Sequence, residues 1–147
     1  MSHPILSRIL YVEDEPHIQA VAQIALEDVG GFTVTLASSG KECIERAKTF
    51  SPDLILLDVM MPGMDGPSTF RALRAIPETA GIPVIFLTAK VQPKEVESYK
   101  RLGALDVICK PFDPMTLSDE IRAIWEKSQQ APPESANEPV KAPANRP

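Results

Sequence analysis

Short apolar runs alternate with helix-spaced apolar positions between residues 5 and 128. Nearly continuous runs of aliphatic and β-branched residues are typical of strands, whereas apolar residues three or four positions apart are typical of helices. The predicted strands are Arg8–Val12, Phe32–Ala37, Leu54–Leu57, Val84–Leu87 and Asp106–Cys109. This alternation predicts an α/β fold, a doubly wound parallel sheet of five strands with five helices.

The strands differ in how their polar positions are placed. Arg8–Val12, Leu54–Leu57 and Val84–Leu87 are almost wholly apolar, as expected for central strands covered by helices on both faces. Phe32–Ala37 alternates apolar residues with threonine, which is typical of a half-exposed edge strand. Right-handed crossovers leave few topologies for such a series, and we favour strand order 2-1-3-4-5.

Apolar residues at helical spacing separate the strands. The first helix is predicted from a single stripe formed by Ile18, Val21, Ala22, Ala25 and Val29. Pro16 suits its first turn, and Gly30–Gly31 suits its end. The other helices are marked by Cys43, Ile44 and Ala47, by Phe70 and Leu73, by Val96, Tyr99 and Leu102, and by Leu117, Ile121, Ile124 and Trp125.

The composition of the chain changes after residue 128. Residues 5–128 have the pattern of one folded domain, and the length of 147 residues fits a single core. Residues 129–147 contain five prolines and Val140 as the only large aliphatic residue. Such a segment buries too little apolar surface to offset the entropy of ordering, so residues 129–147 are expected to form a disordered tail.

Composition narrows the possible partners and compartments. The hydrophobic fraction of 44% and charged fraction of 24% are ordinary for a globular protein, and the net charge of -5 argues against nucleic acid as a partner. Neither a basic leader nor a membrane-length apolar stretch is present, so we expect a cytoplasmic protein without a membrane partner. Cys43 and Cys109 lack metal or redox spacing and are expected to be two buried small residues without a disulfide.

Acidic and basic residues follow three of the predicted strands directly. Glu13 and Asp14 follow the first strand, Asp58 follows the third, and Lys110 follows the fifth. The carboxyl ends of neighbouring parallel strands meet in one crevice, so these side chains are expected to form one site. Three carboxylates there would repel one another unless a hard divalent cation with oxygen ligands neutralised them. The sequence therefore predicts a metal-dependent phosphoryl site.

Four separated motifs point to one protein family. They are Val12–Pro16, Asp58–Gly66, Leu87–Ala89 and Lys110–Phe112. Taken in this order, each at the end of a strand, they resemble the receiver domain of two-component response regulators over residues 7–128. The resemblance implies a flavodoxin-like (CheY-like) fold, in which the strand order 2-1-3-4-5 is known.

The resemblance also assigns roles to individual residues. It implies that Asp58 accepts a phosphoryl group from a histidine kinase or phosphotransfer protein, with Thr88 and Lys110 binding phosphoryl oxygens. Magnesium is the implied cofactor, and its implied ligands are Glu13 through a water, Asp14, Asp58 and the backbone carbonyl of Met60. A cis Lys110–Pro111 bond is implied by the resemblance alone.

The sequence departs from the family at the position three residues before Lys110. The family usually has a tyrosine or phenylalanine there, whose ring moves inward when the conserved hydroxyl engages the phosphoryl group, but this chain has Val107. We therefore expect the switch to run through backbone movement of the loop after Thr88. Met60 and Lys90 occupy the two positions at which the family tunes the lifetime of the phosphoryl group.

The function expected from these features is that of a single-domain response regulator, which catalyses only its own phosphorylation and dephosphorylation. Its output is expected through an unidentified protein, as a monomer or weak homodimer. An aspartate-nucleophile phosphohydrolase is the enzymatic alternative, although Met60 stands where such enzymes have a second acid. A flavodoxin-like cofactor binder is disfavoured because Glu13–Glu15 would repel a phosphate. A receiver-shaped interaction module that is never phosphorylated is the fourth alternative.

Overall fold

The structure, a computed structural model, describes residues 5–130 as a five-stranded sheet with helices on both faces. All strand pairs are parallel, and the order β2-β1-β3-β4-β5 confirms the predicted topology. The strands are β1 (Arg8–Val12), β2 (Thr33–Ala37), β3 (Leu54–Asp58), β4 (Val84–Thr88) and β5 (Asp106–Cys109). The sequence pattern therefore located every strand to within a residue.

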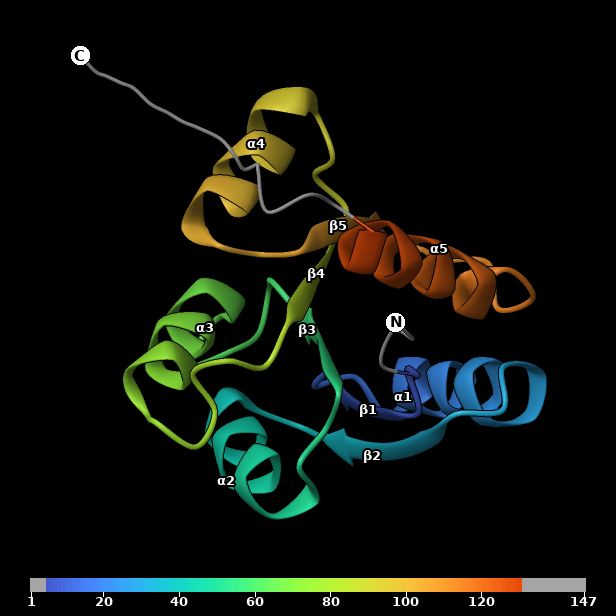
Figure 1. Cartoon of the computed structure of the whole chain (residues 1–147), viewed down its shortest axis with the longest axis horizontal. Helices are drawn as coiled ribbons and strands as arrows, with labels where there is room; N and C mark the ends of the chain where they lie inside the picture. The colour runs from blue at the N-terminus through green and yellow to red at the C-terminus, as the bar shows by residue number, and fades with distance from the viewer. Residues whose placement is uncertain (1–4, 131–147) are drawn as a thin grey trace.

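The helices divide between the two faces of the sheet. Figure 1 shows α1 and α5 on one side, and α2, α3 and α4 on the other. Their bounds are α1 (Pro16–Gln23), α2 (Gly40–Phe50), α3 (Gly66–Ala75), α4 (Pro93–Leu102) and α5 (Leu117–Gln130). Each crossover helix returns the chain to the end of the sheet where the strands begin, so the carboxyl ends of all five strands lie at the opposite end.

Two apolar clusters, one on each face, hold the layers together. The residues of β3 and β4 are all buried, which explains why their sequences lack alternation. Alternate residues of each strand enter opposite clusters: Ile9 and Tyr11 pack toward α1 and α5, whereas Leu10 and Val12 pack toward α2 and α3. Strand β2 is only partly buried, as predicted for the edge.

The predicted apolar stripe of the first helix is wrong in detail. The α-helix ends at Gln23, and the chain continues as a π-helical segment η1 (Ile24–Val29). The residues that this arrangement buries are Ala22, Ala25 and Leu26, whereas Val21 and Val29 of the predicted stripe are exposed. A π turn holds more residues than an α turn and so rotates the later side chains around the axis.

Helix α5 supports this π-helical segment. The hydroxyl of Ser118 donates to the carbonyl of Ala25 over 2.8 Å, and the guanidinium of Arg122 donates to the carbonyl of Gly30. These contacts join residues more than 90 positions apart, so the change in helix type depends on tertiary packing that no local pattern reveals.

The end of α5 lies slightly beyond the predicted domain boundary. The helix continues to Gln130, two residues past position 128. The predicted tail otherwise lies outside the described residues. Within residues 5–130, no helix combines the length and apolar character needed to cross a membrane.

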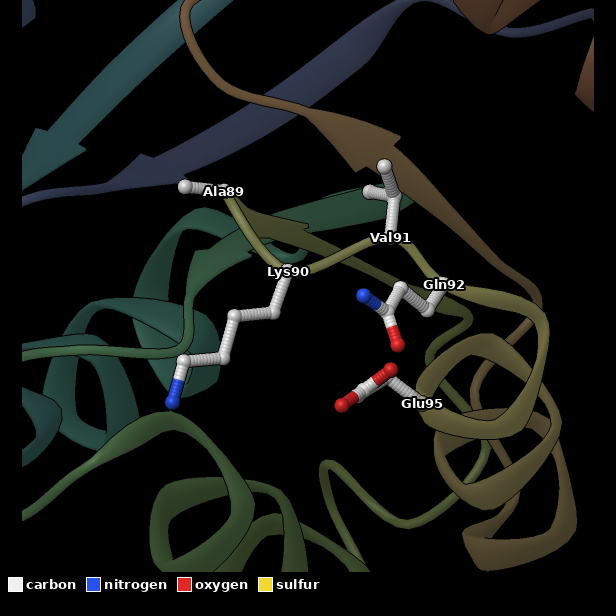
Figure 2. Close-up of a pocket in the computed structure, with 5 residues that line it drawn as sticks. All are labelled: Ala89, Lys90, Val91, Gln92 and Glu95. Atoms are coloured by element: carbon white, nitrogen blue, oxygen red, sulfur yellow. The ribbon is translucent and has the colours of Figure 1, made fainter.

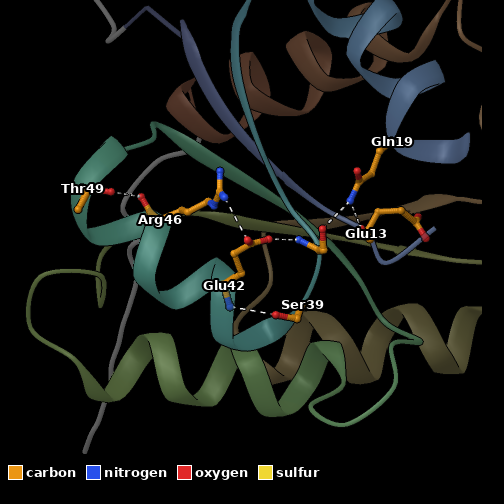
Figure 3. Close-up of polar contacts among 7 residues, drawn as sticks. Glu13, Gln19, Ser39, Glu42, Arg46 and Thr49 are labelled. Atoms are coloured by element: carbon orange, nitrogen blue, oxygen red, sulfur yellow. Dashed lines mark hydrogen bonds and ion pairs between the residues drawn. The ribbon is translucent and has the colours of Figure 1, made fainter. Parts of the chain in front are cut away.

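The start of α2 has a hydrogen-bonded cap that can be tested. The Ser39 hydroxyl accepts from the backbone N–H of Glu42 over 3.1 Å (Figure 3). Substitution Ser39→Ala leaves this N–H without its partner, and we expect the free energy of unfolding to fall by about 1 kcal/mol, measured by urea denaturation. Ser98→Ala, at an exposed position inside α4, is the control and should change stability little. Equal stability of Ser39→Ala and wild type would contradict the role of this cap.

The Glu42 side chain completes the same helix start and makes it sensitive to acid. Its carboxylate accepts from the backbone N–H of Ser38 and pairs with Arg46 at 3.0 Å (Figure 3). The bond from Ser38, followed by Arg46, lowers the pKa of Glu42 below its ordinary value of 4.5. A lowered folded-state pKa means that the stabilisation is fully present above pH 4.5 and is lost as the pH falls through the folded-state pKa.

We therefore expect Glu42→Gln to be less stable than wild type at pH 7, and the difference to shrink below pH 4.5. Denaturant unfolding between pH 3 and pH 7 measures both proteins under the same conditions. A difference that is independent of pH would refute the assignment of the acid sensitivity to this carboxylate.

Candidate functional site

Three carboxylates meet at the carboxyl ends of β1 and β3. Oxygen atoms of Glu13, Asp14 and Asp58 all lie within 4.8 Å of one another. Glu13 and Asp58 are each 2% exposed, while Asp14 faces solvent. Sequence analysis predicted this gathering. We call these three residues the acid cluster.

Strand register explains how the acid cluster forms. Val12 of β1 pairs with Leu57 of β3, so the next residues along the two strands are Glu13 and Asp58. The backbone N–H of Glu13 donates to the carbonyl of Ala37 on β2, which fixes the chain before it turns into α1. Gln19, one turn into α1, donates from its side chain to the carbonyl of Glu13 (Figure 3). The backbone of Glu13 is therefore held by β2 through its N–H and by α1 through its carbonyl.

Lys110 contacts two members of the acid cluster. Its Nζ lies 3.0 Å from Glu13 Oε1 and 3.3 Å from Asp58 Oδ2. Burial alone lowers the pKa of Lys110, but the hydrogen bond from its ammonium to Glu13 and the charges of both acids outweigh burial, so the pKa is raised. Burial raises the pKa of Glu13, and the neighbouring Asp58 charge adds to that effect against the opposing contact with Lys110. The bond between Lys110 and Pro111 is cis, as the resemblance implies.

The donor set of the acid cluster fits a magnesium ion. All candidate ligands are oxygen atoms, which Mg²⁺ prefers, and the exposed Asp14 leaves a side open for the waters that this ion retains. One lysine cannot balance three acids, so a divalent cation would complete the charge compensation. The backbone N–H of Met60 donates weakly to Asp58 Oδ1, at 3.4 Å, which places the Met60 backbone beside the cluster.

Thr88 lies at the end of β4, but its hydroxyl does not contact the acid cluster in the described structure. Instead it accepts from the backbone N–H of Lys90 over 3.0 Å. The following loop and Glu95 line a cavity of 420 Å³. Figure 2 shows the Lys90 side chain at one margin of this cavity and Glu95 at another. Thr88 therefore braces the start of the loop that follows β4.

Tyr11 is a buried residue of the site region that sequence analysis missed. Its side chain has no exposed surface, and its hydroxyl makes no hydrogen bond of good geometry among the described residues, although it lies near enough to the Glu13 carboxylate to interact with it. Burial, followed by the charges of Glu13 and Asp58, raises the pKa of this hydroxyl. The signal was present in the sequence, because residues two apart on a strand share a face and Tyr11 precedes Glu13 by two.

Val107 occupies a partly buried position in the cluster of apolar residues beneath α3 and α4. Aromatic rings from other elements pack in the same cluster: Phe86 of β4 lies 5.1 Å from the Tyr99 ring of α4 and 5.8 Å from the Phe70 ring of α3. The rings of this cluster thus come from β4, α3 and α4, and the β5 position contributes the smaller Val107. Cys43 and Cys109 are both free, as predicted, but the expectation that both are buried is wrong for Cys109, which is exposed.

Known proteins resemble this chain in sequence and in fold. Residues 9–122 match the family model described as the response regulator receiver domain. The chemotaxis response regulator CheY4 of Vibrio cholerae is a structural relative with a TM-score of 0.74 and 29% identity, covering 82% of this chain and 99% of that one. A response regulator from Desulfuromonas acetoxidans has a TM-score of 0.72 and 31% identity, covering 82% and 97%.

Two curated relatives extend beyond the matched region. The alkaline phosphatase synthesis transcriptional regulatory protein PhoP of Bacillus subtilis is 38% identical over 87% of this chain and 52% of its own length. The DNA-binding response regulator MtrA of Mycolicibacterium smegmatis is 35% identical over 86% of this chain and 54% of its own. This chain thus spans about half the length of the curated relatives that it matches.

These relatives correct one prediction. Sequence analysis excluded nucleic acid as a partner from the net charge of -5. That exclusion was wrong, because relatives that share this chain's pattern are named as DNA-binding and transcriptional regulators. A net charge describes only the residues counted, and these residues correspond to about half of each relative. The single-domain form stays a prediction.

Proposed function

This chain belongs to the receiver domain family of response regulators, and on that premise we propose that it is a magnesium-dependent phosphorylation switch in which Asp58 is the phosphoryl acceptor. The proposed donor is the phosphohistidine of a histidine kinase or phosphotransfer protein. One observation carries the proposal: the buried Asp58 carboxylate lies in the acid cluster, with the ammonium of Lys110 only 3.3 Å away. The proposed nucleophile, the proposed cation site and the positive charge of Lys110 therefore lie close together.

The transfer requires one bond to form as another breaks. A carboxylate oxygen of Asp58 forms a bond to phosphorus while the bond from phosphorus to the donor imidazole nitrogen breaks, and the imidazole leaves as a neutral ring that keeps the proton already held on its other nitrogen. Phosphoryl transfer has a loose transition state, so positioning and charge stabilisation dominate its catalysis. Bound magnesium would supply charge neutralisation at the phosphoryl oxygens. Glu13, Asp14, Asp58 and the Met60 carbonyl are its proposed ligands.

Lys110 is proposed to bind first the acids of the cluster and then a phosphoryl oxygen. In the described structure it compensates Glu13 and Asp58. Once the acid cluster is compensated by a divalent cation, the ammonium can instead donate to a phosphoryl oxygen. This exchange explains why a lysine so close to the acceptor does not block its reaction.

The conformational response is proposed to start at Thr88. Its hydroxyl would leave the N–H of Lys90 and donate to a phosphoryl oxygen, which would draw in the loop that lines the cavity of Figure 2. Two loop conformations with different affinities for a partner would be sufficient for a switch. The names of the curated relatives support transcriptional control as the output.

The phosphohydrolase alternative has less support. The family of aspartate-nucleophile hydrolases would need a second acid two residues after Asp58, and the Met60 side chain found there is 70% exposed and carries no proton to transfer. No further enzymatic role is proposed.

The test is phosphorylation of the purified chain by a small acyl phosphate with Mg²⁺. We expect intact mass spectrometry to detect one added phosphoryl group, and fragmentation after borohydride reduction to locate it at Asp58. Chelation of Mg²⁺ should prevent the reaction. Labelling that persists fully in the chelator, or that maps to another residue, would refute the proposal.

A further inference from the structure

Tyr11 places a buried hydroxyl beside the acid cluster, and within residues 5–130 this hydroxyl makes no hydrogen bond of good geometry. The side chain lies on the same face of the sheet as α1 and α5, within the cluster that includes Ile9 and Leu56. The side chain has 0% exposure, and its hydroxyl makes no well-formed hydrogen bond among the described residues, although the Glu13 carboxylate is near enough to act on it as a hydrogen-bond acceptor. Burying a hydroxyl without a hydrogen bond costs free energy, so a tyrosine here requires an explanation that phenylalanine would not.

The geometry of the sheet places the Tyr11 side chain on the same face as the acids that follow the strands. Tyr11 and Glu13 share a face of the same chain segment, and Tyr11 pairs with Leu56, which lies two residues before Asp58 on β3. Burial raises the pKa of this hydroxyl most, and the charges of Glu13 and Asp58, with a side-chain interaction with Glu13, raise it further. In the described structure both oxygens of Glu13 are engaged elsewhere, by Lys110 at 3.0 Å and by the N–H of Glu15 at 3.4 Å.

We propose that Tyr11 is a positioning residue for Glu13, whose carboxylate accepts a hydrogen bond from the Tyr11 hydroxyl when the acid cluster holds magnesium and Lys110 has withdrawn. The proposal rests on the proposed function, because it assumes that the cluster is a magnesium site. A buried carboxylate that loses its cationic partner needs another donor. Donors behind a metal site fix the orientation of its acids, and their loss commonly weakens metal binding by about 10-fold to 100-fold.

The experiment compares wild type, Tyr11→Phe and Tyr99→Phe by calorimetric titration with MgCl₂. Tyr11→Phe keeps the ring and removes only the hydroxyl, and Tyr99→Phe removes the same group from α4. We expect the Mg²⁺ dissociation constant to rise about 10-fold in Tyr11→Phe and to stay unchanged in Tyr99→Phe. In the absence of Mg²⁺, Tyr11→Phe should be at least as stable as wild type, because a buried hydroxyl without a well-formed hydrogen bond has been removed. An unchanged Mg²⁺ affinity would overturn the proposal.

A double-mutant cycle separates positioning from packing. If Tyr11 acts through Glu13, Tyr11→Phe should have no effect on Mg²⁺ affinity in a Glu13→Ala background. An equal weakening in both backgrounds would overturn the proposal, since it would show that the hydroxyl acts by another route.

A spectroscopic readout does not depend on the variant folding. Mg²⁺ should produce a near-ultraviolet tyrosine difference spectrum in wild type and in Tyr99→Phe, because the environment of the Tyr11 hydroxyl changes. A spectrum that is flat in wild type would overturn the proposal. Wild type that binds Mg²⁺ and is phosphorylated, together with an indifferent Tyr11→Phe, refutes only the role of Tyr11, whereas wild type that binds no Mg²⁺ refutes the proposed function as well.

Discussion

Substitution Asp58→Asn is expected to reduce phosphorylation of the chain by a small acyl phosphate to an undetectable level. The change keeps the size of the side chain at a position that is 2% exposed, but it replaces the nucleophilic oxygen pair with a neutral amide. It also replaces one of the three carboxylates of the acid cluster with a neutral amide, so Mg²⁺ affinity should fall at the same time. Intact mass spectrometry after incubation with acyl phosphate and Mg²⁺ measures the first effect directly.

The matched control is Asp28→Asn, at an exposed position on η1. It removes the same charge at a site that does not belong to the acid cluster, and labelling should stay at the wild-type level. Wild-type labelling of Asp58→Asn would eliminate this residue as the acceptor. Circular dichroism of both variants distinguishes loss of chemistry from loss of fold.

The acid cluster could be predicted because its geometry follows from strand direction. Once Arg8–Val12 and Leu54–Asp58 are parallel neighbours, the residues that follow them must share one edge of the sheet. The negative charges of these side chains then predict a cation site, and this prediction needs no further knowledge of the tertiary structure. The same logic placed Lys110 beside Asp58, which the structure bears out at 3.3 Å.

The parts that could not be predicted depend on contacts between distant segments. The π-helical segment Ile24–Val29 faces α5, and the Ser118 hydroxyl of α5 donates to the carbonyl of Ala25. Nothing in the local spacing of apolar residues indicates the change from an α-helix to a π-helix. Thr88 was expected to serve the phosphoryl group, yet in the described structure its hydroxyl holds Lys90, an alternative that only coordinates reveal. The kind of output partner could not be predicted either, because the net charge of -5 does not identify what a receiver domain binds.

Replacement of Lys110 by methionine is expected to destabilise the magnesium-free protein by about 3 kcal/mol. The Glu13 and Asp58 side chains are 2% and 3% exposed, and Lys110, itself only 20% exposed, is the cation that contacts both. Methionine preserves the length and packing of the side chain, so the loss falls mainly on two buried carboxylates left without compensation. The partial exposure of Lys110 places the expected effect at the lower end of the range for broken buried pairs. Urea denaturation in a chelating buffer measures this effect.

Magnesium should reverse much of that loss, and this reversal separates charge compensation from simple packing. A ligand that binds only the folded state stabilises it in proportion to the logarithm of its concentration, and two acids freed from Lys110 should bind Mg²⁺ more readily. Lys90→Met, which removes an exposed lysine from the neighbouring loop, is the matched control and should leave stability nearly unchanged with or without Mg²⁺. A Lys110→Met protein that is equally destabilised in chelator and in excess Mg²⁺ would indicate that the lysine acts through its aliphatic chain. A third outcome is a Lys110→Met protein that regains its stability with Mg²⁺ and is still phosphorylated slowly by acyl phosphate. That result would give Lys110 two separate roles: it neutralises the acids before the cation binds, and it stabilises the charge of the phosphoryl group afterwards.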